Sequence, residues 1–182
     1  MAQEHEVVTA DEARPASLTW ALRALLALIA FGAVVVALIV IRHDDLLRVW
    51  AEGNPSARRI LETKGLEAIK HPGEYDIKPP HFVAPALTLC GVIASLVAVI
   101  MVYLRNGFEW ARVVLTLLLA FTAVASIGGI MTGPPFLFVV LTVIEIAIGA
   151  AAVVFMWMPA TTRYIHPRAG AEVERLREHV GL

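Results

Sequence analysis

The segment FLFVVLTVIEIAIGAAAVVFMWM, residues 136–158, decides the fold. It is long enough for an α-helix to cross a bilayer, which takes about 20 mostly apolar residues. Three more stretches, 24–41, 82–104 and 113–131, are apolar and carry no charge at all. Because backbone groups in lipid must pair within their own segment, the sequence predicts an all-α polytopic membrane protein, a bundle of four transmembrane helices.

The overall composition favours the same class of protein. Of the 182 residues, 58% are hydrophobic and 17% are charged, whereas about a quarter of the residues in a soluble domain are charged. The net charge of −1 provides no basic field, so we expect no nucleic-acid partner. The single cysteine, Cys90, excludes an intramolecular disulfide and a cysteine-based zinc site.

Catalytic and cofactor-binding motifs are missing from the sequence. It has no G-x-S-x-G, P-loop, dinucleotide fingerprint or H-E-x-x-H. His71, Glu74, Asp76 and His81 are possible metal ligands, but their spacings match no standard zinc motif. We therefore expect no enzymatic activity, no metal and no cofactor.

The loop 42–81 is the only long connection between the spans, and we expect it to be extracytoplasmic and partly helical. Asp44 or Asp45 is the expected cap of a first short helix that ends near Gly53. A second should begin with Asn54 as N-cap and Pro55 in its first turn, and end at Gly65. These helices should lie on the membrane surface or on top of the bundle with Trp50 inward, followed by an extended strap over 71–81.

The two chain ends are predicted to be cytoplasmic tails. Residues 1–19 have little apolar content and should be disordered, and residues 159–182 should contain a short helix. Arginines flank the turn between the second and third spans, whereas the turn TGPP before the fourth span is uncharged. By the positive-inside rule, this favours a plasma-membrane protein with both termini in the cytoplasm.

Glu145 is the one charged residue within the spans, and a carboxylate at a helix centre costs about 2.5–3.5 kcal/mol. It should therefore face protein or water, most simply in its protonated form. Counting residues from the end of each span opposite the tails places Thr122, Gly91 beside Cys90, and Gly32 at the same depth. Thr142 lies one turn away on the same helix, and a hydrogen bond from Glu145 to Thr122 is geometrically possible.

Three hypotheses for Glu145 remain open. It could hold helices together, it could face a partner protein, or it could bind a proton, cation or substrate amine. A cavity that reaches Glu145 and is lined by Thr122, Thr142 and Ser126 would favour ligand binding or transport. A dry acid bonded to one hydroxyl would favour packing.

The stretch RNGFEWARVVLTLLLAF and the later MWMPATTRYI resemble small uncharacterised four-span membrane proteins of actinobacteria. The shared features are an N-G-x-x-W-A-R turn before the third span and a P-A-x-x-Y exit from the fourth, here Pro159, Ala160 and Tyr164. This resemblance covers residues 105–166 and implies the fold and an inside location for the turn, but no activity. Arg105, Trp110 and Arg112 are the expected interface anchors at the headgroups.

Together these features predict a non-catalytic integral membrane protein. Its expected role is an accessory or scaffold subunit of a membrane complex, or a homo-oligomer, in contact with membrane lipids. The alternative is a small transporter, channel or lipid- or ligand-binding membrane protein that uses Glu145.

Overall fold

The computed structural model describes residues 15–71, 73, 75 and 77–165, and this part of the chain contains helices and no strand. Four helices are long and apolar enough to cross a membrane: α1 (Ala16–Ile41), α5 (Val83–Arg105), α6 (Glu109–Ile130) and α7 (Phe136–Met156). Their most apolar windows have a mean hydropathy between 2.3 and 3.2. The prediction of an all-α, four-helix, multi-pass membrane protein is confirmed.

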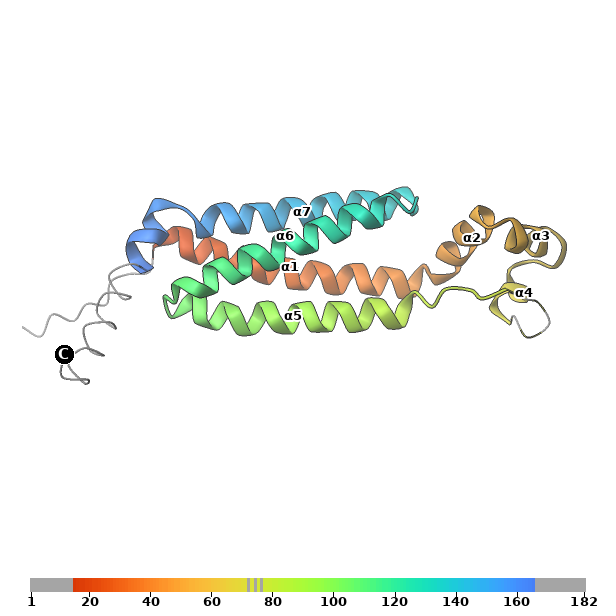
Figure 1. Cartoon of the computed structure of the whole chain (residues 1–182), viewed down its shortest axis with the longest axis horizontal. Helices are drawn as coiled ribbons and strands as arrows, with labels where there is room; N and C mark the ends of the chain where they lie inside the picture. Colours follow the sequence, from red (N-terminus) through yellow and green to blue (C-terminus); the bar gives the residue numbers. More distant parts are fainter. Residues whose placement is uncertain (1–14, 72, 74, 76, 166–182) are drawn as a thin grey trace, which may run out of the picture.

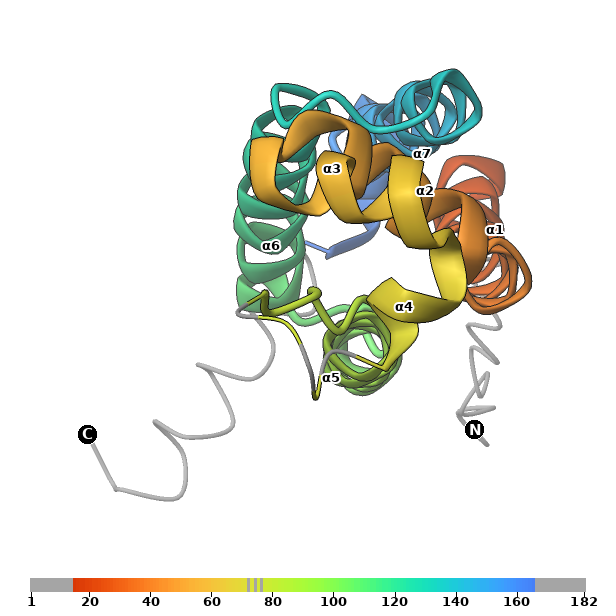
Figure 2. The ribbon, with the colours of Figure 1, turned by 90° about the vertical axis from the view of Figure 1, so that its right-hand side faces the viewer.

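The four long helices form a ring in which each packs on two neighbours. α1 lies between α5 and α7, and α6 completes the ring between the same two helices (Figures 1 and 2). Residues 15 and 165 and the turn from α5 to α6 lie at one end, which we call the terminal end. The turn from α6 to α7 lies at the other end, beyond which the helices of the long loop extend, and we call this the cap end (Figure 1).

The two halves of the bundle are packed differently. The fully buried side chains of the bundle lie in the half near the terminal end. In the half near the cap end, the described residues of the four helices are all at least partly exposed. The bundle is therefore closed at one end and open at the other. Its buried core consists of Leu18, Ala21, Leu25, Val97, Ile100, Leu104, Ala111, Leu115, Leu119, Ala152, Met156 and Ile165.

The predicted tails are shorter than expected, because both contribute to the closed end. α1 begins at Ala16, so residues 15–19 are not part of a disordered tail. Residues 159–165 form one further helical stretch, in which Thr161 and Ile165 are buried. Ser17 and Thr161 share a hydrogen bond of 2.7 Å between their hydroxyls. The predictions for residues 1–14 and for the C-terminal helix after residue 165 lie outside the described residues.

The long loop folds into a cap of three short helices, α2 (His43–Gly53), α3 (Pro55–Lys64) and α4 (Leu66–Lys70). The prediction for α3 is confirmed, because the Asn54 side chain accepts hydrogen bonds from the backbone of its first turn and Gly65 ends it with φ +81°. The sequence did not predict α4. The α2 prediction was wrong at its start, since neither Asp44 nor Asp45 caps it and Arg42 links it directly to α1.

The cap packs mainly on itself rather than on top of the bundle. Ala51, Ala57 and Ile69 form a small buried cluster, and Trp50 packs against it from one side, as expected. Contacts to the long helices come mainly from the junction of α1 with α2. The cap therefore extends beyond the ends of α1 and α5 (Figure 1).

Candidate functional site: the cavity around Glu145

Glu145 lies near the middle of α7, where two adjacent cavities meet. The larger, which we call the main cavity, has a volume of about 490 Å³ and is lined by all four long helices. The smaller, the side cavity, has about 370 Å³ and lies mainly between α6 and α7. Both are lined by the same five residues, Leu28, Leu119, Thr122, Ser126 and Glu145.

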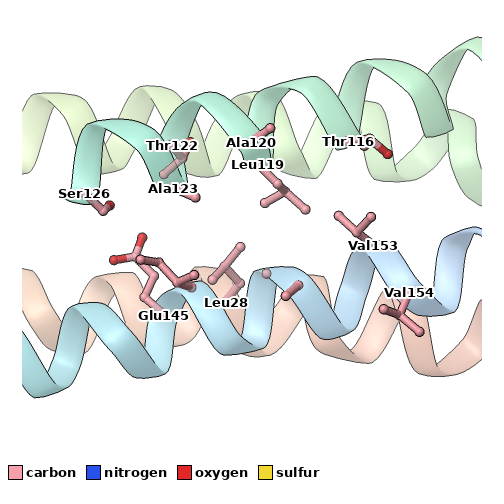
Figure 3. A pocket seen from close by; sticks show the side chains of 13 residues that line it. Leu28, Thr116, Leu119, Ala120, Thr122, Ala123, Ser126, Glu145, Val153 and Val154 are labelled. Carbon is pink, nitrogen blue, oxygen red and sulfur yellow. The ribbon is translucent and has the colours of Figure 1, made fainter. Parts of the chain in front are cut away.

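The Glu145 carboxylate points toward α6, where Ser126 lies across from it (Figure 3). The hydrogen bond from Glu145 to Thr122, which the sequence made geometrically possible, is absent, and the Thr122 hydroxyl donates to the Leu118 carbonyl of its own helix at 2.9 Å. Such local bonds compete with contacts between helices. Among the residues that the structure describes, no group hydrogen-bonds the Glu145 carboxylate or the Ser126 hydroxyl.

The residues that the sequence placed at the depth of Glu145 lie around the main cavity in three cases. Gly32, Cys90 and Thr122 line the main cavity together with Glu145. A Cβ atom on Gly32 would lie 3.6 Å from the Cys90 sulfur, so α1 and α5 meet at this level. Gly91 and Thr142, by contrast, line neither cavity.

Most of the cavity surface is apolar, and the main cavity is not sealed. Its lining includes Leu89 of α5 and Phe121 of α6, which are 62% and 72% exposed. Cavities of this size bind small molecules elsewhere, with few polar groups fixing the orientation. Here the polar groups that lack a protein partner are Glu145 and Ser126.

The chemistry of this pair is that of an acceptor site. An ionised carboxylate only accepts hydrogen bonds, and a serine hydroxyl can accept as well as donate. Within residues 15–71, 73, 75 and 77–165, no Lys, Arg or His lines either cavity, so an ionised Glu145 has no cationic side chain from this part of the chain beside it. Burying a charge without a partner is costly, and a ligand cation would remove that cost.

The three expected interface anchors do not share one environment. Arg105 and Trp110 are exposed at the terminal end, as an anchor requires. Arg112 is only 3% exposed, so its prediction as a headgroup anchor was wrong. Its guanidinium lies over the Trp157 ring and bonds Thr162 and Glu109, and the first two of these contacts join segments too distant in the sequence for a local pattern to indicate.

The possible metal ligands of the strap give no cluster within the described residues. No three His, Cys, Asp or Glu side chains gather there, and Glu74 and Asp76 lie outside that part of the chain.

In comparisons with known proteins, no family model matches the sequence, and no significant match is found among curated proteins or solved structures.

Proposed function

We propose that this protein is a non-catalytic membrane protein that binds an apolar ligand carrying a cationic amine between its helices. The observation that carries the proposal is that Glu145 and Ser126 have no hydrogen-bond partner within the described chain and line a cavity formed by all four helices. An ammonium group offers three donors and a positive charge to this pair. The apolar walls would enclose the rest of the ligand.

The native Cys90 makes a direct test possible, because it is the only cysteine and it lines the main cavity. The protein in lipid nanodiscs is treated with N-ethylmaleimide, and alkylation of Cys90 is followed by intact-mass spectrometry. We expect dodecylamine to slow alkylation in the wild type and dodecanol to slow it much less. In Glu145→Gln, where the side chain keeps its size but cannot ionise, dodecylamine and dodecanol should slow the alkylation of Cys90 to the same extent.

Two controls separate ligand binding from general membrane effects. Thr142→Val changes a hydroxyl of α7 that lines neither cavity, so protection by dodecylamine should persist. Equal protection by amine and alcohol in the wild type would contradict the proposal. So would amine protection that survives in Glu145→Gln.

A second candidate is the accessory or scaffold role, in which a helix of a partner or of another copy fills the open half. It is supported by the lack of fully buried residues in the cap half of the bundle. The test is a pull-down in gentle detergent of the wild type beside Glu145→Gln. A defined companion protein that is lost in the variant would favour this role over ligand binding.

The proposed location is the plasma membrane, with the terminal end in the cytoplasm. Support comes from exposed Arg23, Arg105 and Arg163 at that end, and from the uncharged turn 131–135 at the other. A reporter that is active only outside the cytoplasm, inserted after Gly133, should be active. The resemblance to actinobacterial four-span proteins agrees with this orientation and stays a prediction.

A further inference from the structure

A separate cavity of about 420 Å³ lies where the cap joins the bundle, and we call it the cap pocket. His43 enters it from the first turn of α2, directly after α1 ends. His81 enters from the strap, two residues before α5 begins. Because the pocket lies at the ends of two spans, it sits at the depth of lipid headgroups. Its lining consists of His43, Leu47, Ile69, Lys70, Ile77, Lys78, Pro79, Pro80 and His81.

The polar side chains that line the cap pocket are all basic: two lysines and two histidines. The described acids close to it, Asp44 and Glu67, do not line the pocket. The Lys70 ammonium is 2.8 Å from a carboxylate oxygen of Asp44 and 3.1 Å from one of Glu67. A second Asp44 oxygen lies 3.7 Å from Nδ1 of His43. Lys70 is therefore held in place by carboxylates that are not themselves part of the lining.

Among the described residues, Lys78 differs from Lys70 in having no acid partner. Within the described residues, no carboxylate lies within ion-pair distance of its ammonium group, and the side chain is exposed. A lysine binds phosphate as a compact positive charge, and basic pockets beside spans bind lipid headgroups. A phosphate between Lys78 and Lys70 would have two ammonium groups to contact, with the imidazoles of His43 and His81 beside them.

We infer that the cap pocket binds a phosphate group, and that at this depth the group is the phosphodiester of an anionic membrane lipid. The inference uses no part of the cavity around Glu145, so either proposal can fail without the other. Lys78 supplies a positive charge that no described carboxylate neutralises, and Lys70 supplies a second charge that Asp44 positions. The prolines and Ile77 form the wall of the pocket.

Native mass spectrometry in neutral detergent can test this inference with defined probes. The full chain is titrated with dioctanoyl phosphatidylglycerol and with dioctanoylglycerol, which lacks the phosphate. We expect the phospholipid to bind more tightly, and Lys78→Gln to weaken its binding about fivefold. Lys78→Arg should restore most of the binding.

The matched control is Lys64→Gln, which removes the same charge from an exposed position at the end of α3, outside the cap pocket. It should leave binding of the phospholipid unchanged. Equal losses in Lys78→Gln and Lys64→Gln would overturn the inference, because they would indicate general surface attraction. So would equal binding of phosphatidylglycerol and dioctanoylglycerol. Unchanged thermal unfolding of the variants excludes misfolding as the cause.

Inorganic phosphate, added as a competitor, distinguishes the source of the group. If the site serves a lipid headgroup, millimolar phosphate should displace little of the bound phosphatidylglycerol. Efficient displacement would show that the site takes a free phosphate and would overturn the assignment to a lipid.

Discussion

The guanidinium carbon of Arg112 lies 4.2 Å from the centre of the Trp157 ring, and this contact ties the start of α6 to the end of α7. One guanidinium nitrogen donates to the Thr162 hydroxyl at 3.0 Å, and another pairs with Glu109 at 3.2 Å. The Trp157 indole donates in turn to Thr116 at 2.9 Å. A charged side chain is thus part of the closed end of the bundle.

Replacing Arg112 with lysine should destabilise the protein, because an ammonium lacks the planar surface that stacks on Trp157 and the fork that reaches two partners. We expect the free energy of unfolding to fall by about 1–2 kcal/mol. Denaturant titration in detergent micelles measures this change. Arg105→Lys, at an exposed position of the same turn, should change it by less than about 0.5 kcal/mol. Similar effects of the two substitutions would contradict the assigned role.

The hydroxyls of Ser17 and Thr161 should be energetically coupled. Thr161 donates to the Phe155 carbonyl at 3.1 Å, so its hydroxyl is left to accept from Ser17. A double-mutant cycle with Ser17→Ala and Thr161→Val should give a coupling of about 0.5–1.5 kcal/mol in the free energy of unfolding. Simple additivity of the two substitutions would mean that the hydrogen bond contributes nothing.

Filling the main cavity should protect Cys90 from reagents. A leucine at Gly32 enters the cavity beside the Cys90 sulfur, so Gly32→Leu should slow alkylation by N-ethylmaleimide several-fold. Gly91→Leu adds the same side chain next to the cysteine, but at a position with open space and outside the cavity lining. Its alkylation rate should stay close to that of the wild type. The rates come from intact-mass spectra taken over time.

Gly65→Ala should destabilise the cap alone. Gly65 has φ +81° and ψ −179°, a backbone region that is essentially restricted to glycine. Nothing lies within 4 Å of an added Cβ, so the cost of about 1–3 kcal/mol comes from the backbone. Hydrogen exchange should become faster in α3 and α4 and stay unchanged in α6. Gly53→Ala, which also meets open space but at the end of a helix without positive φ, should leave exchange unaltered.

The ion pair between Asp44 and Lys70 predicts how the cap responds to pH. The hydrogen bond from Lys70 lowers the pKa of Asp44 below its ordinary 3.8, and the bonds to Asp44 and Glu67 raise the pKa of Lys70 above 10.5. A lowered carboxyl pKa stabilises the fold above pH 3.8, and this contribution is lost as pH falls through the folded value. A raised ammonium pKa stabilises below pH 10.5, and this is lost as pH rises further.

Hydrogen exchange of α2 and α4, corrected for intrinsic rates, should therefore show constant protection between about pH 5 and 9. Protection should decline below that range, and the decline due to Asp44 should disappear in Lys70→Met. Because Asp44 is exposed and Lys70 is partly exposed, added salt should reduce the effect. If protection at low pH declined equally in Lys70→Met and in the wild type, the decline would have to come from carboxylates other than Asp44.

The parts of this structure that could be predicted from the sequence depend on neighbouring residues or on simple counting along the chain. Hydropathy located the four spans, and Asn54, Pro55 and Gly65 located α3 because capping acts within one turn. Gly32, Cys90 and Thr122 could be placed at the depth of Glu145 because every helix rises by about 1.5 Å per residue.

What the sequence could not indicate depends on contacts between distant segments. The start of α1 at Ala16 is tied to Thr161, far along the chain, and the burial of Arg112 depends on Trp157 covering it. The expected partner of Glu145 was wrong for a different reason. The Thr122 hydroxyl donates a hydrogen bond to a carbonyl of its own helix. Matching depths does not show toward which side of its helix a residue points.

The pairing of α1 with α7 has a consequence for how the chain is made. Of the four spans, α1 is synthesised before the others, yet it packs most extensively on α7, the fourth, and Ile165 lies in the same buried core. At roughly 5–20 residues per second, the stretch between Ile41 and Ile165 takes on the order of 6–25 s to synthesise. During that time the α7-facing flank of α1 is not yet covered by α7. Docking of α7 is therefore the step that closes the four-helix ring, and a chain that ends after α6 would leave this flank uncovered.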